Sequence, residues 1–445
     1  MAGSARAVRR VPGNPVWSKA LPSNPDEVAE GALSLAERYT GATLARLMRF
    51  LGMVTLEWEA HGAVVRDVHG DEYVECGGYG MFVHGHTHPR VVEAVRIQAG
   101  DLAQSTRMLP NLPQAEFAYE LAQVAPGDLQ YSFFCNSGAE AVEGALKLAR
   151  AATSRAGILA ANGAFHGKTF GALSASGKKQ YREPFVPLVP DFHHVPFGDG
   201  PALAAAADAV AAGPGGLAAI ILEPIQGEAG VVVPPAGYLR QARALCDRLG
   251  ALLIMDEVQT GVGRTGDWFC CTQEGVVPDI LATAKSLGGG VMPLAAFIAR
   301  PSCWGPFDED PFLHSSTFGG SPLASAAGLA ALRAIRDEGM LERAREIGER
   351  LERDLGEIGR RYPGAIAAVR GRGLFWGLEL RNEGLGGVLL NHLLNHAGVL
   401  VVYSQNQPKV IRVMPPAVIS DAQLDFVVEE VDRAAREAEA VSGQV

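Results

Sequence analysis

Short apolar segments recur through the middle of the chain and alternate with stretches in which apolar residues have helical spacing. Within each short segment consecutive residues are apolar, so a strand formed there would be buried on both faces, as in a parallel sheet covered by helices. The apolar segments include QYSFFCN, GILAANGAF, LAAIILEP and ALLIMDEV, and the helical stretches include EAVEGALKLARAAT and YLRQARALCDRLG. The pattern predicts an α/β fold in which residues 90–328 form a large domain with a mostly parallel central sheet.

The amino-terminal part of the chain has a different pattern. Residues 1–30 are rich in Pro, Ser and charge and are expected to form an arm. Helical spacing follows from about Ser34 to Leu51, and an alternating segment then turns at His69 and Gly70, as a hairpin or meander would.

Beyond the central region, a charged helix over about 325–361 leads into the strand RGRGLFWGLELR and a mixed α/β segment. We therefore expect residues 31–89 and 329–445 to build a second, smaller α/β domain together, from both ends of the chain.

Composition and charge narrow the class of protein. The chain has 445 residues, 48% of them hydrophobic, and 53 glycines, which fits a large globular protein with an ample core. Its net charge of −10 argues against nucleic-acid binding, which requires a clustered basic excess. No apolar run of about 18 residues is present to span a membrane, and no apolar segment follows the basic start as in a secretory signal. We expect neither a nucleic acid nor a membrane as partner.

Six cysteines are scattered along the chain without the spacing of a disulfide framework. Reduced thiols of this kind are typical of a cytosolic protein, so a cytoplasmic location is expected. The cysteines are Cys76, Cys135, Cys246, Cys270, Cys271 and Cys303.

An apolar strand ends at Asn136, and a strong helix begins directly after it with Ser137, Gly138 and Ala139. The amino end of a helix offers free N–H groups and a positive dipole, so these three residues could cradle a phosphate. Ser137 could instead serve only as the N-cap of the helix, with Gly138 easing the turn. The local pattern leaves both interpretations open.

A second buried strand ends in acid, at Asp256 and Glu257. The segment GVGRTG at 261–266 matches the dinucleotide-binding pattern G-x-G-x-x-G, but a loop-like aromatic sequence follows where that motif needs a helix. An acid at the carboxyl end of a parallel strand faces the ligand crevice of an α/β fold. A carboxylate held there against a pyridine nitrogen would keep that nitrogen protonated, and Asp256 is suited to this role.

Lys285 follows another apolar strand and precedes three glycines at 288–290. A single lysine is most often a solvated surface charge, but this one stands among small and apolar residues. Desolvation there would lower its pKa from about 10.4 and free the amine to attack an aldehyde. The glycines would let the backbone approach a flat cofactor. Lys285 and Asp256 are therefore the predicted catalytic residues.

The run from His84 to His88 contains three histidines, and imidazoles are good metal ligands. No cysteine or carboxylate set at ligand spacing accompanies them. We therefore expect no metal site, but a loop and a helix start near the entrance of the active site, with Tyr79 as a substrate contact.

Taken in order along the chain, these motifs resemble those of the class III aminotransferases of the ornithine and putrescine type. The resemblance covers roughly residues 40–430 and is closest to the putrescine type. It is carried by GGYGMFVHGHTHP, YSFFCNSGAEAVEGALKLA, GAFHGKTFGALSA, LGGGVMPLAA and FLHSSTFGGSPLA. It implies the fold-type I architecture of enzymes that depend on pyridoxal 5′-phosphate (PLP), and a homodimer with active sites between the subunits.

The resemblance also implies how PLP would be held. Lys285 would bind it as a Schiff base, Asp256 would anchor its ring nitrogen, and residues 137–139 would bind its phosphate. Phe165 and Val258 would lie against the two ring faces, Gln259 would hydrogen-bond the phenolic oxygen, Glu223 would steady that neighbourhood, and Thr317 would reach the phosphate of the neighbouring subunit.

Two charged residues bear on the substrate. Arg412 resembles the arginine that grips the α-carboxylate of 2-oxoglutarate or glutamate, although an ion-pair role within the fold stays open. Glu228 resembles the glutamate that pairs with this arginine when an ω-amine brings no carboxylate. Tyr79, Glu228 and Arg412 are thus the expected substrate-binding residues.

The expected reaction is a ping-pong transfer of the amino group of a primary ω-amine, such as a diamine or an ω-amino acid, to 2-oxoglutarate or pyruvate, or the reverse amination of an aldehyde. The alternatives are an aminomutase or racemase on the same fold, and a biosynthetic aminotransferase acting on a specialised-metabolite aldehyde or ketone. A protein that only binds the cofactor is disfavoured, because Lys285, Asp256, Gln259 and Arg412 are all present.

Overall fold

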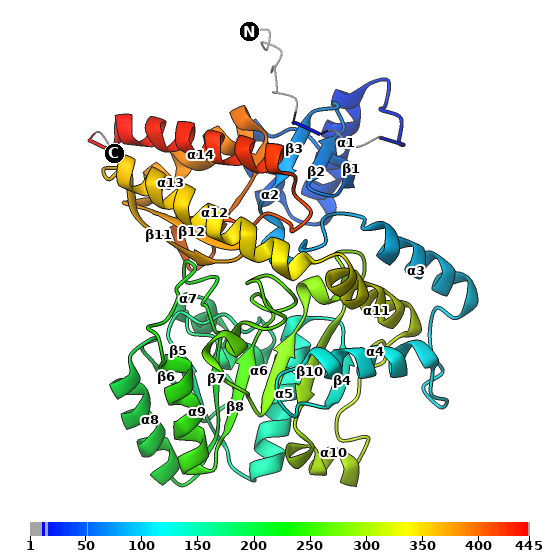
Figure 1. Ribbon diagram of the computed structural model, residues 1–445, viewed down its shortest axis with the longest axis vertical. Helices are drawn as coiled ribbons and strands as arrows, with labels where there is room; N and C mark the ends of the chain where they lie inside the picture. The colour runs from blue at the N-terminus through cyan, green and yellow to red at the C-terminus, as the bar shows by residue number, and fades with distance from the viewer. Residues whose placement is uncertain (1–10, 14–16, 51, 444–445) are drawn as a thin grey trace.

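The computed structural model describes residues 11–13, 17–50 and 52–443, and its largest sheet has seven strands in the order β4-β10-β9-β8-β7-β5-β6 (Figure 1). Strand β10 runs antiparallel to β4 and β9, while the other neighbouring strands are parallel. The expected mostly parallel central sheet is therefore confirmed. Its strands are β4 (Tyr131–Cys135), β5 (Gly157–Ala161), β6 (Phe192–Val195), β7 (Leu217–Leu222), β8 (Leu252–Asp256), β9 (Ile280–Thr283) and β10 (Ala295–Ala299).

Helices cover both faces of this sheet, because alternate residues of its strands pack into different hydrophobic clusters. Leu159 and Leu253 share a cluster with residues of α8 and α9, whereas Ile158 and Ile254 share one with residues of α5. Strands that are apolar at consecutive positions are buried in this way. The helices of this region are α4 (Leu112–Val124), α5 (Gly138–Thr153), α6 (Phe170–Ala175), α7 (Lys179–Arg182), α8 (Gly200–Ala212), α9 (Tyr238–Leu249), α10 (Gly305–Glu309) and α11 (Pro322–Asp337).

The two ends of the chain meet in two smaller sheets, ordered β1-β2-β3-β13 and β11-β12-β15-β14. Strand β13 (Val399–Leu400) pairs in parallel with β3 (Glu72–Glu75), so both ends build the small α/β part as expected. The other strands are β1 (Glu57–His61), β2 (Val64–Asp67), β11 (Ile366–Arg372), β12 (Phe375–Leu380), β14 (Val402–Ser404) and β15 (Gln407–Val413). The helices of this part are α1 (Pro25–Tyr39), α2 (Ala42–Phe50), α12 (Met340–Arg361), α13 (Glu383–Asn391) and α14 (Asp421–Val441), whereas α3 (Pro89–Asp101) packs against α11.

Three expected elements are wrong, and each is divided at a glycine with positive φ. The helix expected from Ser34 is two helices, α1 and α2, separated at Gly41 (φ +141°), and Leu51 lies outside the described residues. The charged helix over 325–361 is α11 and α12, separated at Gly339 (φ +64°). The strand RGRGLFWGLELR is the hairpin β11–β12, which turns at Gly373 (φ +57°). Glycine adopts these conformations without steric cost, so the chain turns there.

The expected division of the chain into 1–30, 31–89, 90–328 and 329–445 stays a prediction. Part of the expected arm, residues 1–10 and 14–16, lies outside the described residues, and α1 begins before its end, at Pro25. Helix α11 continues across the expected boundary at 328.

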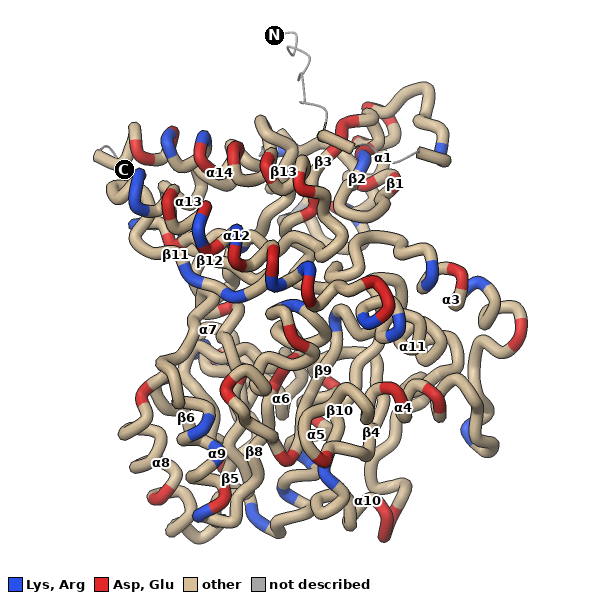
Figure 2. The backbone as a smooth tube through the Cα atoms, in the orientation of Figure 1, with Lys and Arg blue, Asp and Glu red and all other residues tan. Residues whose placement is uncertain are grey.

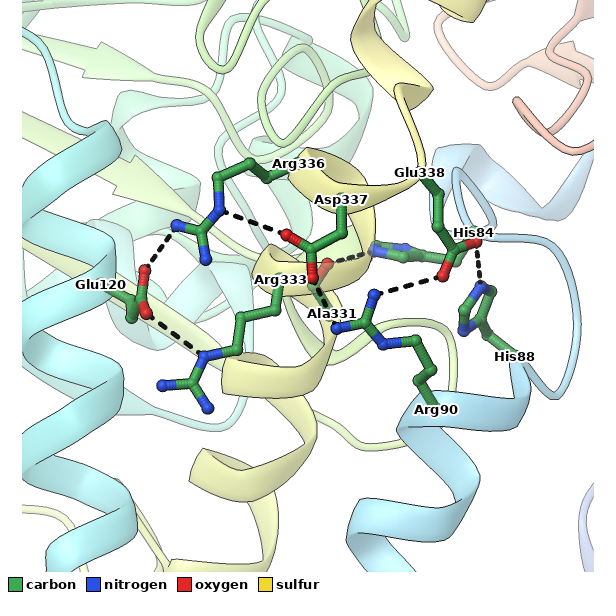
Figure 3. A network of polar contacts seen from close by, with 9 residues as sticks. All are labelled: His84, His88, Arg90, Glu120, Ala331, Arg333, Arg336, Asp337 and Glu338. Atoms are coloured by element: carbon green, nitrogen blue, oxygen red, sulfur yellow. Dashed lines mark hydrogen bonds and ion pairs between the residues drawn. The ribbon is translucent and has the colours of Figure 1, made fainter.

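A network of polar contacts fixes α11 against α3 and α4 (Figure 3). Glu120 of α4 pairs with Arg333 and Arg336 of α11 at 3.2 and 2.8 Å, and Arg90 of α3 pairs with Asp337 at 2.7 Å. A single exposed ion pair contributes little to stability. Here several ion pairs share partners, and together they fix the positions of the three helices relative to one another.

The three histidines of the 84–88 run have separate partners instead of converging on one point. His84 donates to the Ala331 carbonyl at 3.0 Å, His86 pairs with Glu75 at 3.1 Å, and His88 pairs with Glu338 at 3.1 Å. His88 is the N-cap residue of α3, so the helix start expected there is confirmed. Burial lowers the pKa of His84 to about 4, which keeps this imidazole neutral at physiological pH.

Charges of both signs are interspersed over the described chain. Figure 2 shows Lys and Arg alternating with Asp and Glu along α12 and α14, without a basic band. In the part of the chain that the structure describes, none of the helices has both the length and the apolar character needed to cross a bilayer.

Candidate active site

A cavity of about 510 Å³ opens at the carboxyl ends of the central strands. This edge is where ligands bind in α/β folds, since the loops after parallel strands converge there. Ten of the predicted site residues line it: Ser137, Gly138, Ala139, Phe165, Glu223, Glu228, Asp256, Val258, Gln259 and Lys285.

Lys285 follows β9 and enters the cavity in a strained backbone conformation, with φ of +51°. A residue with a β-carbon adopts this conformation only when its surroundings enforce it, and such residues concentrate at functional sites. Burial lowers the pKa of the amine, and the nearby Arg412 acts in the same direction, while Asp256 and Glu228 oppose it. Lys285 has no hydrogen bond or ion pair with any described side chain, so its amine is available for covalent chemistry.

Asp256 ends β8 and is joined to a buried histidine that sequence reasoning missed. The distance from His166 Nδ1 to Asp256 Oδ2 is 2.7 Å, and the Val258 N–H donates to Oδ1 at 3.1 Å. Burial opposes protonation of His166, but the hydrogen bond to Asp256 and the negative charges of Asp256 and Glu223 together outweigh it, so the pKa of the imidazole is raised. Each oxygen of the Asp256 carboxylate retains a lone pair for a further donor.

Glu223 follows β7 and faces the same cavity. Its Oε1 accepts from the Phe165 N–H at 3.0 Å and its Oε2 from the Gly227 N–H at 3.3 Å. Burial, assisted by the negative charge of Asp256, raises the pKa of Glu223 to about 7. Glu223 thus fixes the loop that carries Phe165 while close to half-protonated at neutral pH.

The amino end of α5 shows the N-cap role expected for Ser137, and the phosphate role of residues 137–139 stays a prediction. Ser137 is the N-cap, in a capping box with Glu140. The amides of Gly138 and Ala139 have no acceptor among the described residues, and they lie in the cavity wall. A β-carbon at Gly138 would lie 2.8 Å from Val258 Cγ1, so only glycine lets α5 approach this closely. Two free amides at a helix end have the chemistry that suits an anion.

Glu228 and Arg412 form a buried ion pair beside the cavity, at 2.7 Å. Arg412, on β15, is fully buried, and its Nη2 donates to the Tyr403 carbonyl at 3.3 Å. Its Nε has no hydrogen-bond partner among the described residues. Arg412 does not line the cavity itself; Glu228 stands between them.

Tyr79 lies at the same end of the site, although it does not line the cavity. Its ring centre lies 5.7 Å from the Arg412 guanidinium, and its carbonyl accepts from Gln259 Nε2 at 3.2 Å. Tyr79 is 46% exposed and has φ of +50°. A strained, half-exposed aromatic residue above a buried guanidinium suits a ligand contact at an entrance.

Sequence comparison decides the family. The model of the family Aminotransferase class-III matches residues 52–435. The chain belongs to the class III aminotransferases. The structure is similar to that of the ornithine aminotransferase from Toxoplasma gondii ME49, with 30% identity, a TM-score of 0.84, and coverage of 93% of this chain and 96% of that chain.

Two further solved structures are similar to this class III aminotransferase. One is a thermostable (S)-enantioselective omega-transaminase from Thermomicrobium roseum, with 31% identity, a TM-score of 0.84, and coverage of 94% and 99% of the two chains. The other is the acetylornithine aminotransferase from Elizabethkingia anophelis, with 31% identity, a TM-score of 0.76, and coverage of 92% and 99%. The fold-type I architecture expected from the sequence is confirmed.

Class III aminotransferases depend on PLP, and one Toxoplasma gondii ornithine aminotransferase structure has PLP at partial occupancy in its active site. The residues of this class III aminotransferase fit that cofactor. The free amides of Gly138 and Ala139 suit a phosphate, Asp256 suits a protonated ring nitrogen, and the unpaired Lys285 suits an aldehyde carbon.

Thr317 is separate from this site within one chain of the class III aminotransferase. It is exposed and lines a different hollow of about 360 Å³, with Glu140 and His314. Its expected role requires a second subunit and stays a prediction.

The class III aminotransferase also contains a site residue, His166, that the sequence-based prediction missed. His166 lies in GAFHGK, directly after Phe165, in the loop that follows β5. The sequence did contain a signal for it: His166 is a polar residue next to Phe165, which was predicted to stack on the ring, just after the end of a strand.

Proposed function

We propose that this class III aminotransferase transfers the amino group of a primary ω-amine to 2-oxoglutarate or pyruvate by a ping-pong mechanism. The observation that carries the proposal is the buried Glu228–Arg412 pair beside Lys285. Paired, these side chains present no net charge to an amine that lacks a carboxylate. When Glu228 turns away, Arg412 offers the planar, bidentate donors that a carboxylate binds.

The named relatives support an amino group remote from a carboxylate. They include ornithine and acetylornithine aminotransferases and an omega-transaminase. Within this class we propose a diamine of the putrescine type as the donor to test first, since the motifs of the chain are closest to that type.

Each residue near the cofactor has a proposed task. When bound, PLP supplies an aldehyde carbon for the amino group and a protonated ring that withdraws electrons from the substrate carbon. Lys285 Nζ, whose pKa is lowered by burial, holds the cofactor and moves the proton at the substrate carbon. Asp256, held in place by its contact with His166, binds the ring nitrogen. Phe165, Val258, Gln259 and Glu223 orient the ring, and Ser137, Gly138 and Ala139 bind its phosphate.

We infer that the working unit is a cytoplasmic homodimer in which Thr317 of each subunit completes the phosphate site of the other. The exposed position of Thr317, away from the cavity of its own chain, supports this arrangement.

The test is a panel of amine donors, each with 2-oxoglutarate, pyruvate or no acceptor, on the PLP-loaded enzyme. We expect putrescine-type diamines or ω-amino acids to give a new amino acid, and more than one equivalent of aldehyde per active site, only when an acceptor is present. Lys285→Ala is the control and should have no turnover. Continued conversion of an amine without any acceptor, beyond one equivalent per active site, would instead identify an aminomutase or racemase.

A further inference from the structure

A two-residue turn holds the Glu228 carboxylate from the side opposite to Arg412. Strands β14 and β15 form a hairpin in which Ser404 pairs with Gln407, so Gln405 and Asn406 form the turn. The Gln405 N–H donates to Glu228 Oε2 at 2.9 Å, while Arg412 Nη1 donates to Oε1 at 2.7 Å. Each oxygen of this carboxylate therefore has its own donor.

The backbone strengthens this connection. The Asn406 N–H donates to the Glu228 carbonyl at 2.9 Å, and Ser404 Oγ donates to the Gly227 carbonyl at 3.2 Å. Glu228 cannot turn away from Arg412 without losing the Gln405 contact as well. The position of the turn thus bears directly on whether Arg412 becomes free.

The turn also accepts hydrogen bonds from two side chains of the α7 segment, those of its N-cap residue Lys178 and of Tyr181. Lys178 Nζ donates to the carbonyls of Gln405 and Asn406, both at 3.1 Å, and the Tyr181 hydroxyl donates to the Gln405 carbonyl at 3.2 Å. Hydrogen bonds from an ammonium group are stronger than neutral ones. Lys178 is therefore the charged group that ties the turn to the large central sheet region, alongside Asn406 Nδ2, which donates to the Gly163 carbonyl at 2.9 Å.

We propose that Lys178, acting through the turn at Gln405 and Asn406, stabilises the closed Glu228–Arg412 pair and so sets the preference of the site between amines and carboxylate acceptors. Lys178 is a positioning residue. The inference rests on the proposed roles of Glu228 and Arg412 in substrate binding.

The expected effect follows from population shift. A carboxylate binds only the open state, so its apparent dissociation constant is the intrinsic one divided by the open fraction. Loss of the Lys178 contacts destabilises the closed state and raises that fraction, whereas an amine without a carboxylate binds a state that is already dominant. We expect the affinity for dicarboxylates to rise about fivefold and that for the amine to change less than about twofold.

The experiment compares Lys178→Met, which keeps the apolar stem and removes the donors, with Lys178→Arg, which keeps a cationic donor. Lys179→Met is the matched control, because Lys179 is the next residue, is exposed, and has no hydrogen bond or ion pair within the described structure. The probe is glutarate, an unreactive dicarboxylate, bound to the PLP-loaded enzyme in a calorimeter. The KM values for 2-oxoglutarate and for the diamine are measured alongside.

The proposal requires tighter glutarate binding and a lower KM for 2-oxoglutarate in Lys178→Met alone, with kcat and the KM of the amine nearly constant and with Lys178→Arg close to the wild type. Unchanged glutarate affinity in Lys178→Met overturns it, as does an equal change in Lys179→Met. Equal weakening for both substrates with a lower unfolding temperature would mean a merely structural role and also overturns it. Arg412→Ala separates the two hypotheses: undiminished glutarate binding there refutes the proposed carboxylate site itself, whatever Lys178 does.

Discussion

At the end of β8, the Asp256 carboxylate and the His166 imidazole share one hydrogen bond. The 2.7 Å contact from His166 raises the pKa of the imidazole despite its burial. Asp256→Asn would keep the shape and remove the negative charge that holds a protonated ring nitrogen. We predict that kcat falls about 10²- to 10³-fold. Single-turnover rates of the variant and the wild type, measured with a saturating amine, check this.

His166→Gln is the companion change, since it keeps a donor but removes the positive charge. This substitution should lower kcat about tenfold. It should also alter the pH profile of kcat/KM, because the imidazole no longer titrates near Asp256. Near-normal rates in Asp256→Asn would refute the assigned role of Asp256, and an unchanged profile in His166→Gln would refute that of His166.

Glu223 links the site to the stability of the fold. Burial raises its pKa from 4.5 to about 7 in the folded chain, so between these values the unfolded chain has released a proton that the folded chain retains. The contribution of Glu223 to the free energy of unfolding is fully present below about pH 4.5. As the pH rises towards 7, about 3 kcal/mol of this contribution is lost. His166, whose pKa is raised from 6.5, adds a loss of the same sign above that value.

Glu223→Gln should therefore flatten the decline of the unfolding temperature between about pH 4.5 and 7. Thermal melts of both proteins with the cofactor removed measure this. Parallel curves for the two proteins would show that Glu223 does not titrate in this range.

The positions of site residues in the cavity wall were predictable from sequence where the signal is local. Lys285 stands after a strand and before glycines, and Ser137 begins a helix, so neighbours alone indicate their tasks. The partners of Asp256 and Glu228 are far away in sequence: His166 is 90 positions from Asp256, and Gln405 is 177 from Glu228. Such pairs depend on how loops converge, which periodicity does not encode.

At the scale of helices and strands, the same distinction applies. The buried strands β5, β7 and β8 were predictable because consecutive apolar residues require burial on both faces. The breaks at Gly41, Gly339 and Gly373 were not, because glycine also occurs inside helices and strands and its φ is set by the packing of the flanking elements.

Gly339, between α11 and α12, tests this account. It has φ of +64°, and the nearest atom to an added β-carbon is Glu342 Oε2 at 3.9 Å, so the cost of Gly339→Ala arises from the backbone alone. We predict a loss of about 1 kcal/mol in the free energy of unfolding. Gly356→Ala is the matched control, because Gly356 lies inside α12 with only Arg360 Nη1 nearby, at 3.6 Å. It should gain about 0.5–1 kcal/mol. Changes of the same sign in urea titrations would contradict the explanation.

At the scale of the whole molecule, the surface near Thr317 is unusually apolar. Phe312 and Met108 are 87% and 86% exposed, and Phe318 is 61% exposed. The two segments lie together, since Arg107 Nη1 donates to the Gly319 carbonyl at 2.8 Å. Large apolar side chains gathered at one place on a surface mark a site of association. This supports a subunit interface that includes Thr317.

Subunit complementation tests that interface. Lys285→Ala removes the amine of its own site but leaves Thr317 intact, whereas Thr317→Asp would repel the phosphate of the site to which Thr317 belongs. If that site is in the other subunit, a mixed dimer of the two inactive variants has one site with both native residues. Dissociating and reassociating equal amounts should then restore about one quarter of the wild-type activity, since half of the dimers are mixed and each has one working site. If Thr317 served its own chain, or if the active protein were a monomer in sedimentation, mixing would restore nothing.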